Sequence, residues 1–361
     1  MNKNLFAMFA LLAVLNSAIA RAATPALPMP ELTARDAAKQ MGLGVNIGNT
    51  FDNTTSWETG WGNPRITKEY IQSLAALGFR NVRLPVAWDT YAHDGRIDAD
   101  KLARVAEVVD WVTSAGMYCV VNIHWDGGWI DAGKVFSAQA AQKYASYWTQ
   151  IATYLADRDE HLVFEALNEE TNFEGAGSTQ KAYATLTRVN QLFIDTVRKT
   201  GGHNAKRLLI ITGYVTDFEK TANKEYSLPT DSVPHRLLIS VHYYTPWQFA
   251  GMTEDANWGK MQLTWGSSGD IADLNRLFDV MQEFCRRNDI PAYVGEFAPT
   301  PKKEAASRVR WMTAVAEAAF SRGMVPVLWE TGGDISRKPP YAPSAALAET
   351  LRNADEIGKQ K

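Results

Sequence analysis

The sequence predicts a single (β/α)8 barrel. Eight short apolar runs alternate along the chain with longer amphipathic segments, and the runs are apolar throughout, as parallel strands buried on both faces are. Polar residues gather where several of these runs end. Because the carboxyl ends of the strands in such a barrel meet at one face, this pattern predicts a functional site there.

The predicted strands and helices alternate along the chain. The strands span residues 42–47, 81–85, 118–123, 162–166, 208–212, 237–241, 292–295 and 325–328. The amphipathic segments span residues 68–77, 100–115, 138–156, 180–200, 270–288 and 303–321, with a last helix at 343–352. Only the fifth crossover, near residues 218–226, is short and weakly patterned. Eight such repeats favour a barrel over an open sheet.

An open doubly wound sheet is the alternative architecture. It would need a glycine-rich phosphate-binding turn after the first strand. Here Gly42 and Gly44 come before that strand ends, so the pattern does not fit. We find no linker or repeat, and expect one catalytic domain over residues 23–361.

The first 22 residues have the pattern of a secretory signal peptide. Lys3 precedes an apolar core over residues 5–15, and small residues follow it. A membrane anchor needs about 20 apolar residues, but Asn16 and Ser17 interrupt this run. We therefore expect cleavage after Ala20 or Ala22, and a secreted or periplasmic protein with no membrane attachment afterwards.

Composition excludes several classes of function. The formal net charge of −3 argues against nucleic acid as a partner. Cys119 and Cys285 are expected to be buried free thiols, although a disulfide is the alternative in an oxidising compartment. No residue spacing resembles a metal site, and we expect neither a metal nor another cofactor.

Two predicted strands end in glutamate. The run over residues 162–166 leads into Asn168 and Glu169, and the run over 292–295 leads into Glu296. Because only the barrel can bring such distant carboxylates together, the pair suggests a hydrolase that uses two carboxylates. Strict alternation would place Asn168 and Glu169 on opposite faces, so we expect the strand to end or bulge there.

Further polar and aromatic residues lie in or just after the other strands. His242 and Tyr244 are spaced by two and share a face if the chain is extended. Each residue alone has a simpler explanation, such as a buried ion pair for Arg83. Their convergence on one barrel mouth favours a binding site, whose candidates are Asn46, Arg83, His124, Trp125, Asn168, His242, Tyr244 and Trp329.

Tryptophan is abundant, with 12 residues, and its placement is informative. Trp111, Trp148 and Trp311 fall in predicted helices and are expected to be structural. Sugar rings have apolar faces that stack on aromatic rings, so tryptophans beside strand ends predict an extended glycan cleft. The alternative is that the loops contain these tryptophans by chance. Under either interpretation, two or three of them are expected only to fill space in the loops. The nine residues concerned are Trp57, Trp61, Trp88, Trp125, Trp129, Trp247, Trp258, Trp265 and Trp329.

These residues, in this order, resemble glycoside hydrolase family 5, the cellulases. The motifs that carry the resemblance are Arg83, His124, Asn168-Glu169, His242-x-Tyr244, Glu296 and Trp329. The segments 48–52, 58–64 and 242–247 are similar to the subfamily 4 endoglucanases. The resemblance covers roughly residues 43–334.

The resemblance implies a retaining endo-acting enzyme that cleaves β-1,4 bonds in cellulose-like or mixed-linkage β-glucans. Glu169 would be the acid/base and Glu296 the nucleophile. The chain is expected to work as a monomer whose partner is the polysaccharide. The resemblance also implies a cis peptide bond between Trp329 and Glu330.

The proposed chemistry requires opposite protonation states of the two glutamates. Arg83 and the hydroxyl of Tyr244 should hold Glu296 ionised. Burial and the charge of Glu296 should raise the pKa of Glu169, so that it can donate a proton. Asn168 is expected to bind the 2-hydroxyl of the sugar, and His124 and His242 to orient hydroxyls or the acid.

Two departures from the family pattern leave the substrate open. Glu170 stands where proline usually follows the acid/base, and Trp125 stands where a second histidine is often found. The same glutamates could act on xyloglucan or mannan. A non-catalytic glycan-binding barrel is a further alternative, but binding alone does not require two opposed carboxylates.

Overall fold

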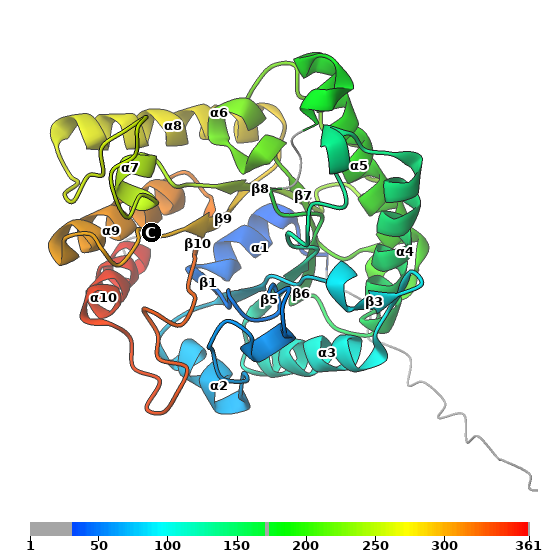
Figure 1. The fold of residues 1–361 in the computed structure, drawn as a ribbon, viewed down its shortest axis with the longest axis horizontal. Coiled ribbons are helices and arrows are strands. Elements are labelled where there is room, and N and C mark those ends of the chain that lie inside the picture. The colour runs from blue at the N-terminus through cyan, green and yellow to red at the C-terminus, as the bar shows by residue number, and fades with distance from the viewer. Residues whose placement is uncertain (1–30, 170–172, 360–361) are drawn as a thin grey trace, which may run out of the picture.

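The computed structural model describes residues 31–169 and 173–359, and it forms the predicted barrel (Figure 1). Eight parallel strands close in the order β1-β10-β9-β8-β7-β6-β5-β2, and β1 pairs with β2 to complete the ring. The strands are β1 (Gly44–Asn46), β2 (Asn81–Leu84), β5 (Tyr118–Asn122), β6 (Leu162–Glu165), β7 (Leu209–Thr212), β8 (Leu237–His242), β9 (Ala292–Phe297) and β10 (Val325–Leu328).

Helices surround the barrel, and their buried stripes pack on the outer face of the sheet. The longer ones are α2 (Lys68–Ala76), α3 (Ala99–Ser114), α4 (Ala138–Tyr154), α5 (Thr179–Lys199), α8 (Ser268–Arg287), α9 (Ala305–Ser321) and α10 (Ala345–Lys359). The weakly patterned fifth crossover contains only the single turn α6 (Phe218–Thr221), and α7 (Trp247–Ala250) is equally short. Short 3₁₀ turns lie at Trp57–Thr59, Asp89–Tyr91, Ala132–Lys134, Glu174–Ala176, Gly202–Ala205 and Tyr214–Thr216.

The sequence analysis missed helix α1 (Ala34–Met41), which closes the amino-terminal end of the barrel. Thr33 caps it by accepting a hydrogen bond from the backbone N–H of Asp36 at 3.1 Å. Its buried side chains pack against inward-facing strand residues such as Val163 and Val327. In Figure 1 it crosses the middle of the ring of strands.

A two-stranded hairpin was also missed. Strands β3 (Ala92–His93) and β4 (Arg96–Ile97) pair antiparallel across Asp94 and Gly95, and both of these residues have positive φ. Asp-Gly is a strong signal for a two-residue hairpin turn, but four paired residues are too few to show an alternating pattern.

The inward-facing positions of the strands change character along the barrel. Near α1 they are apolar, as at Val120, Val163 and Leu238. Two residues further along the same strands they are polar, namely Asn122, Glu165 and Ser240, and all three are fully buried. The period-2 alternation of a strand therefore places a polar layer directly below the carboxyl-terminal face.

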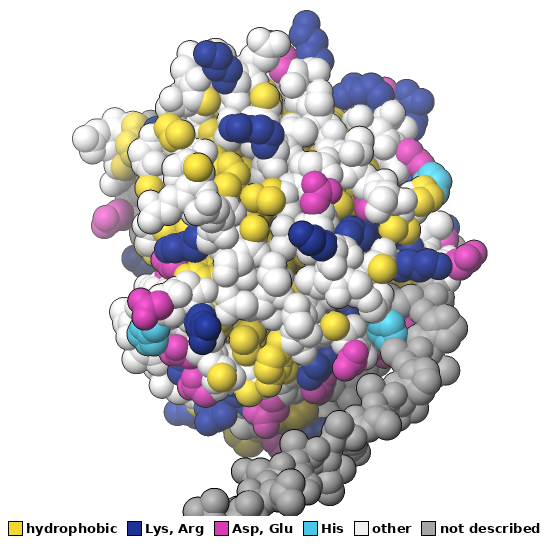
Figure 2. All heavy atoms as spheres, turned by 90° about the vertical axis from the view of Figure 1, so that its right-hand side faces the viewer, with side chains coloured by type: hydrophobic (Ala, Val, Ile, Leu, Met, Phe, Trp, Pro, Cys, Tyr) yellow, Lys and Arg dark blue, Asp and Glu magenta, His cyan; other side chains and the backbone are white. Residues whose placement is uncertain are grey.

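The expectation of two buried free thiols is confirmed. Cys119 and Cys285 are buried free thiols, which excludes the disulfide alternative. Within residues 31–169 and 173–359, no helix is both long and apolar enough to cross a membrane. On the side formed by α3, α4 and α5, charges of both signs are interspersed among apolar side chains (Figure 2), as the small net charge suggests.

Candidate active site

Arg83 is the centre of the polar layer and is completely buried. Its Nε donates to Glu165 at 2.6 Å, one terminal nitrogen donates to Glu296 at 2.7 Å, and the other donates to Asn168 at 2.9 Å. Burial opposes its charge, but the two carboxylates outweigh this and raise the pKa of Arg83. The guanidinium thus fixes three strand ends relative to one another.

Glu165 is a site residue that the sequence analysis did not identify. Its side chain is fully buried and accepts hydrogen bonds from Arg83, from Ser240 at 2.6 Å and from Asn122 at 3.1 Å. A carboxylate inside an apolar strand needs a buried cation, so Glu165 could have been paired with Arg83 from the sequence.

A bulge in β9 turns Glu296 into the barrel. Val241 of β8 lies opposite Val294, whereas the next residue, His242, lies opposite Glu296. The extra residue is Gly295, and a Cβ there would lie 3.0 Å from Ser240 Oγ, a close contact that a larger residue could make only if Ser240 shifted. Without the bulge, the alternation would point Glu296 toward the helices.

Glu296 is held by the two groups predicted for it. Its Oε1 accepts from Arg83, and its Oε2 accepts from the Tyr244 hydroxyl at 2.9 Å. Burial, together with the charges of Glu296 and Glu169, raises the pKa of Tyr244 well above its ordinary value. Tyr244 therefore stays protonated and remains a donor.

Glu169 lies at the rim of the same site and pairs with His242. The chain leaves the strand geometry after Glu165, as expected, and Asn168 continues alongside β5 by donating its N–H to Ile123 O at 3.1 Å. Glu169 Oε1 is 2.6 Å from His242 Nδ1, and the Glu169 side chain is 47% exposed. Ligand atoms of Glu169, His242 and Glu296 all lie within 4.8 Å of one another.

The expectation of a raised pKa for Glu169 is wrong for the unliganded site. Burial by the surrounding protein atoms raises this pKa, but the His242 hydrogen bond and the charges of His242 and Arg83 outweigh burial and lower it. The sequence analysis weighed Glu296 as a neighbour of Glu169, whereas the nearest partner is an imidazole nitrogen.

The remaining polar candidates fall into two groups. Asn46 is fully buried, and its amide donates to Gly295 O at 2.8 Å and Leu328 O at 3.1 Å, so it ties strands together beneath the cleft. Asn168 and His124 line the cleft. Burial and the charges of Arg83 and His242 lower the pKa of His124 well below its ordinary value, which keeps it neutral.

Trp329 also lines the cleft, but the predicted cis bond after it is wrong. Among the described residues the cis bonds are Thr245–Pro246 and Pro339–Pro340. The indole of Trp329 stacks on His124 with ring centres 5.8 Å apart. A Cβ on Gly48 would lie 2.9 Å from the indole, so the missing side chain at Gly48 leaves room for the ring.

The cleft has a volume of about 500 Å³ and contains both glutamates together with Trp247 and Trp329. The nine loop tryptophans divide into packed and exposed rings, and four of them, rather than the expected two or three, pack against the protein. Trp57, Trp88 and Trp265 are buried, and Trp129 packs edge-on against Tyr147. Four rings are more than two-fifths exposed, namely Trp61, Trp125, Trp247 and Trp258.

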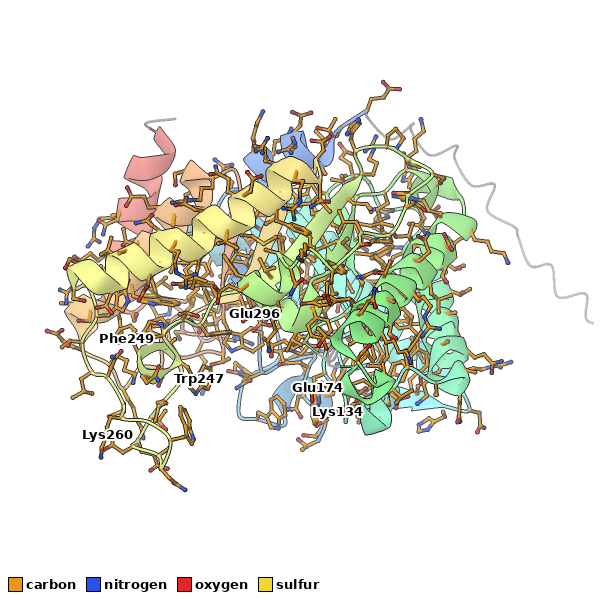
Figure 3. The ribbon with its side chains drawn as sticks, turned by 90° about the horizontal axis from the view of Figure 1, so that it is seen from above. Lys134, Glu174, Trp247, Phe249, Lys260 and Glu296 are labelled. Carbon is orange, nitrogen blue, oxygen red and sulfur yellow. The ribbon has the colours of Figure 1, made fainter. Side chains whose placement is uncertain are left out.

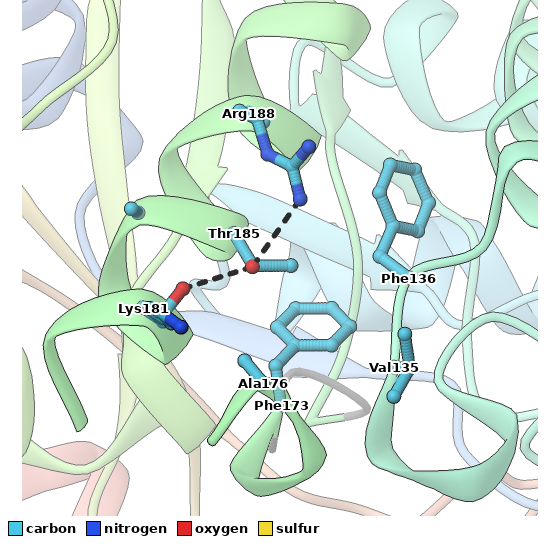
Figure 4. A pocket seen from close by; sticks show the side chains of 8 residues that line it. Val135, Phe136, Phe173, Ala176, Lys181, Thr185 and Arg188 are labelled. Atoms are coloured by element: carbon cyan, nitrogen blue, oxygen red, sulfur yellow. Dashed lines mark hydrogen bonds between the residues drawn. The ribbon is translucent and has the colours of Figure 1, made fainter. Parts of the chain in front are cut away.

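Another pocket lies beside α5, between Phe136 and Phe173 (Figure 4). Its lining is apolar apart from Lys181, Arg188 and Thr185, and Arg188 donates to the Thr185 hydroxyl at 3.4 Å. No carboxylate is among its described lining residues, and the hydroxyl of Thr185 is already bonded to Arg188 and to Lys181 O. We therefore take the cleft above Arg83 as the candidate active site.

The donor set of the cleft could in principle also hold a metal, since Glu169, His242 and Glu296 supply two carboxylates and an imidazole. The same atoms, however, already form the hydrogen bonds to one another, to Arg83 and to Tyr244. A cation would have to displace His242 from Glu169 and compete with the guanidinium. The arrangement fits proton transfer better than metal binding.

Comparison with known proteins agrees with this geometry. The family model described as Cellulase (glycosyl hydrolase family 5) matches residues 43–334. Endoglucanase A of Paenibacillus barcinonensis is 34% identical over 342 residues, covering 85% of this chain and 84% of that protein. A cellulase/esterase of Acetivibrio thermocellus is 35% identical over 312 residues, or 84% of this chain, but the chain spans only 37% of that protein's length.

Solved structures agree as well. A subfamily 4 broad-specificity endoglucanase from Clostridium cellulovorans superposes with a TM-score of 0.82 at 28% identity, covering 93% of this chain and 99% of the other. A Bacteroides ovatus xyloglucanase bound to a XXXG heptasaccharide gives 0.82 at 28% identity, covering 92% and 78%. The chain belongs to the cellulase family, glycosyl hydrolase family 5.

Proposed function

We propose that the chain is a retaining endo-β-1,4-glucanase acting on cellulose-like or mixed-linkage β-glucans. The observation that carries this is the separation of Glu169 and Glu296, whose nearest oxygens lie within 4.8 Å across one cleft. Retaining glycosidases keep their carboxyl groups about 5–5.5 Å apart, whereas inverting enzymes need about 6.5–9.5 Å to admit a water. The separation therefore supports double displacement.

In this mechanism Glu296 is the nucleophile. Hydrogen bonds from Arg83 and Tyr244 stabilise its ionised form. Its carboxylate attacks the anomeric carbon while the glycosidic oxygen takes a proton from Glu169. The resulting glycosyl–enzyme ester is then attacked by water, from which Glu169, now ionised, removes a proton.

The other cleft residues bind the sugar or position the pair. Asn168, whose amide oxygen accepts from Arg83, offers its amide nitrogen to the 2-hydroxyl. Trp329, Trp125 and His124 bind the sugar faces and hydroxyls. Asn46 lies beneath the cleft and helps to position Arg83 rather than to bind the sugar, because its polar atoms are already bonded to Gly295, Leu328 and Arg83.

Substitution of the two glutamates tests the assignment. Glu296→Ala should abolish hydrolysis of every substrate, because no covalent intermediate forms. Glu169→Ala should lose most activity on polysaccharide but less in the first step on an aryl glycoside, whose leaving group needs no proton. Added azide should restore turnover of Glu169→Ala and yield a β-glycosyl azide, detected by NMR.

Glu170 supplies the control for this test. It is acidic and adjacent to Glu169, but lies outside the described residues. Glu170→Ala should keep much of its activity on carboxymethylcellulose. If Glu170→Ala were as inactive as Glu169→Ala and were itself rescued by azide, the acid/base would be Glu170 rather than Glu169.

A xyloglucan-directed endo-hydrolase is the second candidate, supported by the similarity to the Bacteroides ovatus xyloglucanase. A panel of carboxymethylcellulose, mixed-linkage glucan and xyloglucan, assayed for viscosity and reducing ends, separates the candidates. Endo-action should lower viscosity well before reducing ends accumulate. Release of glucose as the sole early product would contradict it.

We further propose export of the chain with loss of residues 1–20 or 1–22, a segment outside the described residues, and action as a monomer in the periplasm or outside the cell. The pattern around Ala20 and Ala22 supports the export. The first residue of the mature protein, determined by amino-terminal sequencing, should be Arg21 or Ala23. A mature protein that begins at Met1 would contradict this, and gel filtration of the mature chain checks the oligomeric state.

A further inference from the structure

The loop that joins β8 to α8, residues 245–266, carries two strongly exposed indoles. We call this loop the tryptophan arm. Trp247 is 51% exposed and lines the cleft, and Trp258 is 66% exposed, the largest value among the exposed large hydrophobic side chains of the described residues. A single exposed tryptophan needs no special explanation, but several hydrogen bonds restrain the turn that carries Trp258.

Trp258 stands at the tip of a closed turn. Ala256 and Gly259 exchange backbone hydrogen bonds of 3.0 and 3.2 Å on either side of it. Asp255 accepts from Lys260 Nζ at 2.8 Å and from the Met261 N–H at 2.9 Å. These four hydrogen bonds restrain the backbone on both sides of the indole.

Hydrogen bonds also connect this turn to the wall of the cleft. Gln262 N donates to Gln248 O at 3.0 Å, and the buried amine of Lys303 donates to Gln248 O at 3.0 Å and to Met252 O at 2.6 Å. Both acceptor residues follow Trp247 closely in the chain. The tip and the cleft wall therefore form one rigid element.

The tip lies beside the helix that carries Trp247. A Cβ on Gly259 would lie 3.8 Å from the Gln248 side chain, so the turn packs directly against α7, the helix that begins with Trp247. In Figure 3 the arm extends from the catalytic face of the barrel, and Trp247 lies between Glu296 and Lys260. The turn that carries Trp258 therefore neighbours the wall of the cleft.

We infer that Trp258 is a stacking platform for a β-glucan chain beyond the cleft, which binds only substrates long enough to pass Trp247. This rests on the proposed glucanase function. The apolar face of a glucose ring covers the indole, and the sugar hydroxyls meet the exposed polar side chains of Glu254, Asp255 and Asn257 beside it. Because the arm is already rigid, binding carries little cost for ordering the loop.

The surroundings of Trp258 favour a sugar over an apolar protein partner. In the chain the ring is flanked by exposed polar and charged residues, with Asp255 and Asn257 before it and Lys260 after it. A protein interface would be expected to centre on a larger cluster of apolar side chains. One ring within polar neighbours matches the alternating apolar faces and hydroxyls of a polysaccharide.

The test compares substrates of two lengths on the full mature enzyme. For wild type and Trp258→Ala, kcat/KM is measured on mixed-linkage β-glucan polymer and on an aryl cellobioside that is too short to leave the cleft. The ratio of polymer to short-substrate kcat/KM should fall about 2- to 10-fold in Trp258→Ala, mainly through KM. Trp258→Tyr should recover part of the ratio.

Leu263→Ala is the matched control, because it removes another exposed apolar side chain from the same arm and should keep the wild-type ratio. An unchanged ratio in Trp258→Ala would overturn the inference, and so would an equal loss on both substrates, which would indicate damage to the fold of the arm.

A binding measurement separates this inference from the proposed function. Migration of the inactive Glu296→Gln variant, with and without Trp258→Ala, is compared in gels that contain β-glucan. If retardation depends on Trp258 but the wild-type enzyme hydrolyses no glucan, the role of Trp258 in glucan binding is supported and the proposed glucanase function is refuted. Hydrolysis by wild type without any dependence on Trp258 would refute the platform alone.

Discussion

Arg83 shows how one buried side chain can organise a catalytic pair. Its three donor directions reach Glu165, Glu296 and Asn168, so the nucleophile and the proposed 2-hydroxyl ligand are positioned by the same guanidinium. Glu165 in turn keeps Arg83 from rotating, because it is itself held by Ser240 and Asn122. A lysine at position 83 could not reproduce this planar arrangement of donors.

The pKa of Glu169 predicts a difference between two pH profiles. In the free enzyme, hydrogen bonding and charge from His242 lower the pKa of Glu169, although the acid must be protonated to act. A bound glucan covers the exposed part of this side chain, and such burial raises a carboxyl pKa. The basic limb should therefore lie at higher pH for kcat than for kcat/KM, because kcat reports the complex and kcat/KM the free enzyme.

Steady-state kinetics on a soluble glucan across the pH range check this prediction. His242→Asn is the informative variant, because it removes the charge that lowers the pKa of Glu169 while keeping a polar side chain. In that variant both basic limbs should move to higher pH. Coincident basic limbs in the wild type would show that substrate binding does not shift the acid.

Individual site residues were predictable to the extent that they follow a strand. Glu169, His242 and Tyr244 could be placed at the barrel mouth because strand ends converge there. The contact between His242 and Glu169 depends on loop conformation after β6, so the direction of the Glu169 shift could not be predicted. The inward turn of Glu296 depends on a bulge at Gly295, which no alternation pattern contains.

At the scale of elements, Gly251 positions Trp247. A Cβ on Gly251 would lie 2.3 Å from the Trp247 indole, so the ring lies directly over this glycine. In Gly251→Ala the indole must move, and it can do so because it is 51% exposed. We predict a fall of about 2- to 10-fold in kcat/KM on polymer, similar to Trp247→Ala, with little change in stability.

Gly269→Ala is the control for this prediction. A Cβ there would meet only Ser267 Oγ at 3.7 Å, an ordinary contact in the first turn of α8. This variant should keep wild-type kinetics and melting temperature. Wild-type kinetics in Gly251→Ala as well would show that the position of Trp247 does not matter for polymer binding.

Elements with many buried contacts were predicted well, and those with few were not. The eight strands have apolar runs because both of their faces are covered. Helix α1 has only eight residues and lies outside the repeating pattern, so its role in closing the barrel depends on tertiary contacts. The single turn α6 confirms that a weak pattern at residues 218–226 meant a short crossover.

At the scale of the whole molecule, the barrel separates stability from chemistry. The face near α1 contains an apolar layer, and the opposite face contains the buried polar layer and the cleft. Two completely buried arginines mark this separation. Arg83 lies beneath the cleft, whereas Arg207 precedes β7 at the amino-terminal face.

Arg207 makes only structural contacts. It donates to the backbone oxygens of Ala156, Arg158, Asp159 and Leu162 and to the side chain of Asn204, and its guanidinium lies 5.3 Å from the Phe164 ring. Burial lowers the pKa of Arg207 to about 9, so it remains charged at neutral pH. The arginine thereby ties the segment between α4 and β6 to the segment that precedes β7.

Replacement of each buried arginine by methionine should therefore have opposite effects on stability and activity. Arg207→Met removes five hydrogen bonds, four to backbone oxygens and one to Asn204, and should lower the free energy of unfolding by about 3–5 kcal/mol. At temperatures where it is folded, its kcat/KM on β-glucan should match wild type, since no contact of Arg207 reaches the cleft. Arg83→Met should lose hydrolysis even where it folds.

Denaturant unfolding followed by tryptophan fluorescence, with kinetics on the same samples, measures both quantities. Arg286→Met removes an exposed pair with Glu283 and should be nearly neutral in stability. A loss of activity in folded Arg207→Met as large as in Arg83→Met would show that the two faces of the barrel are coupled.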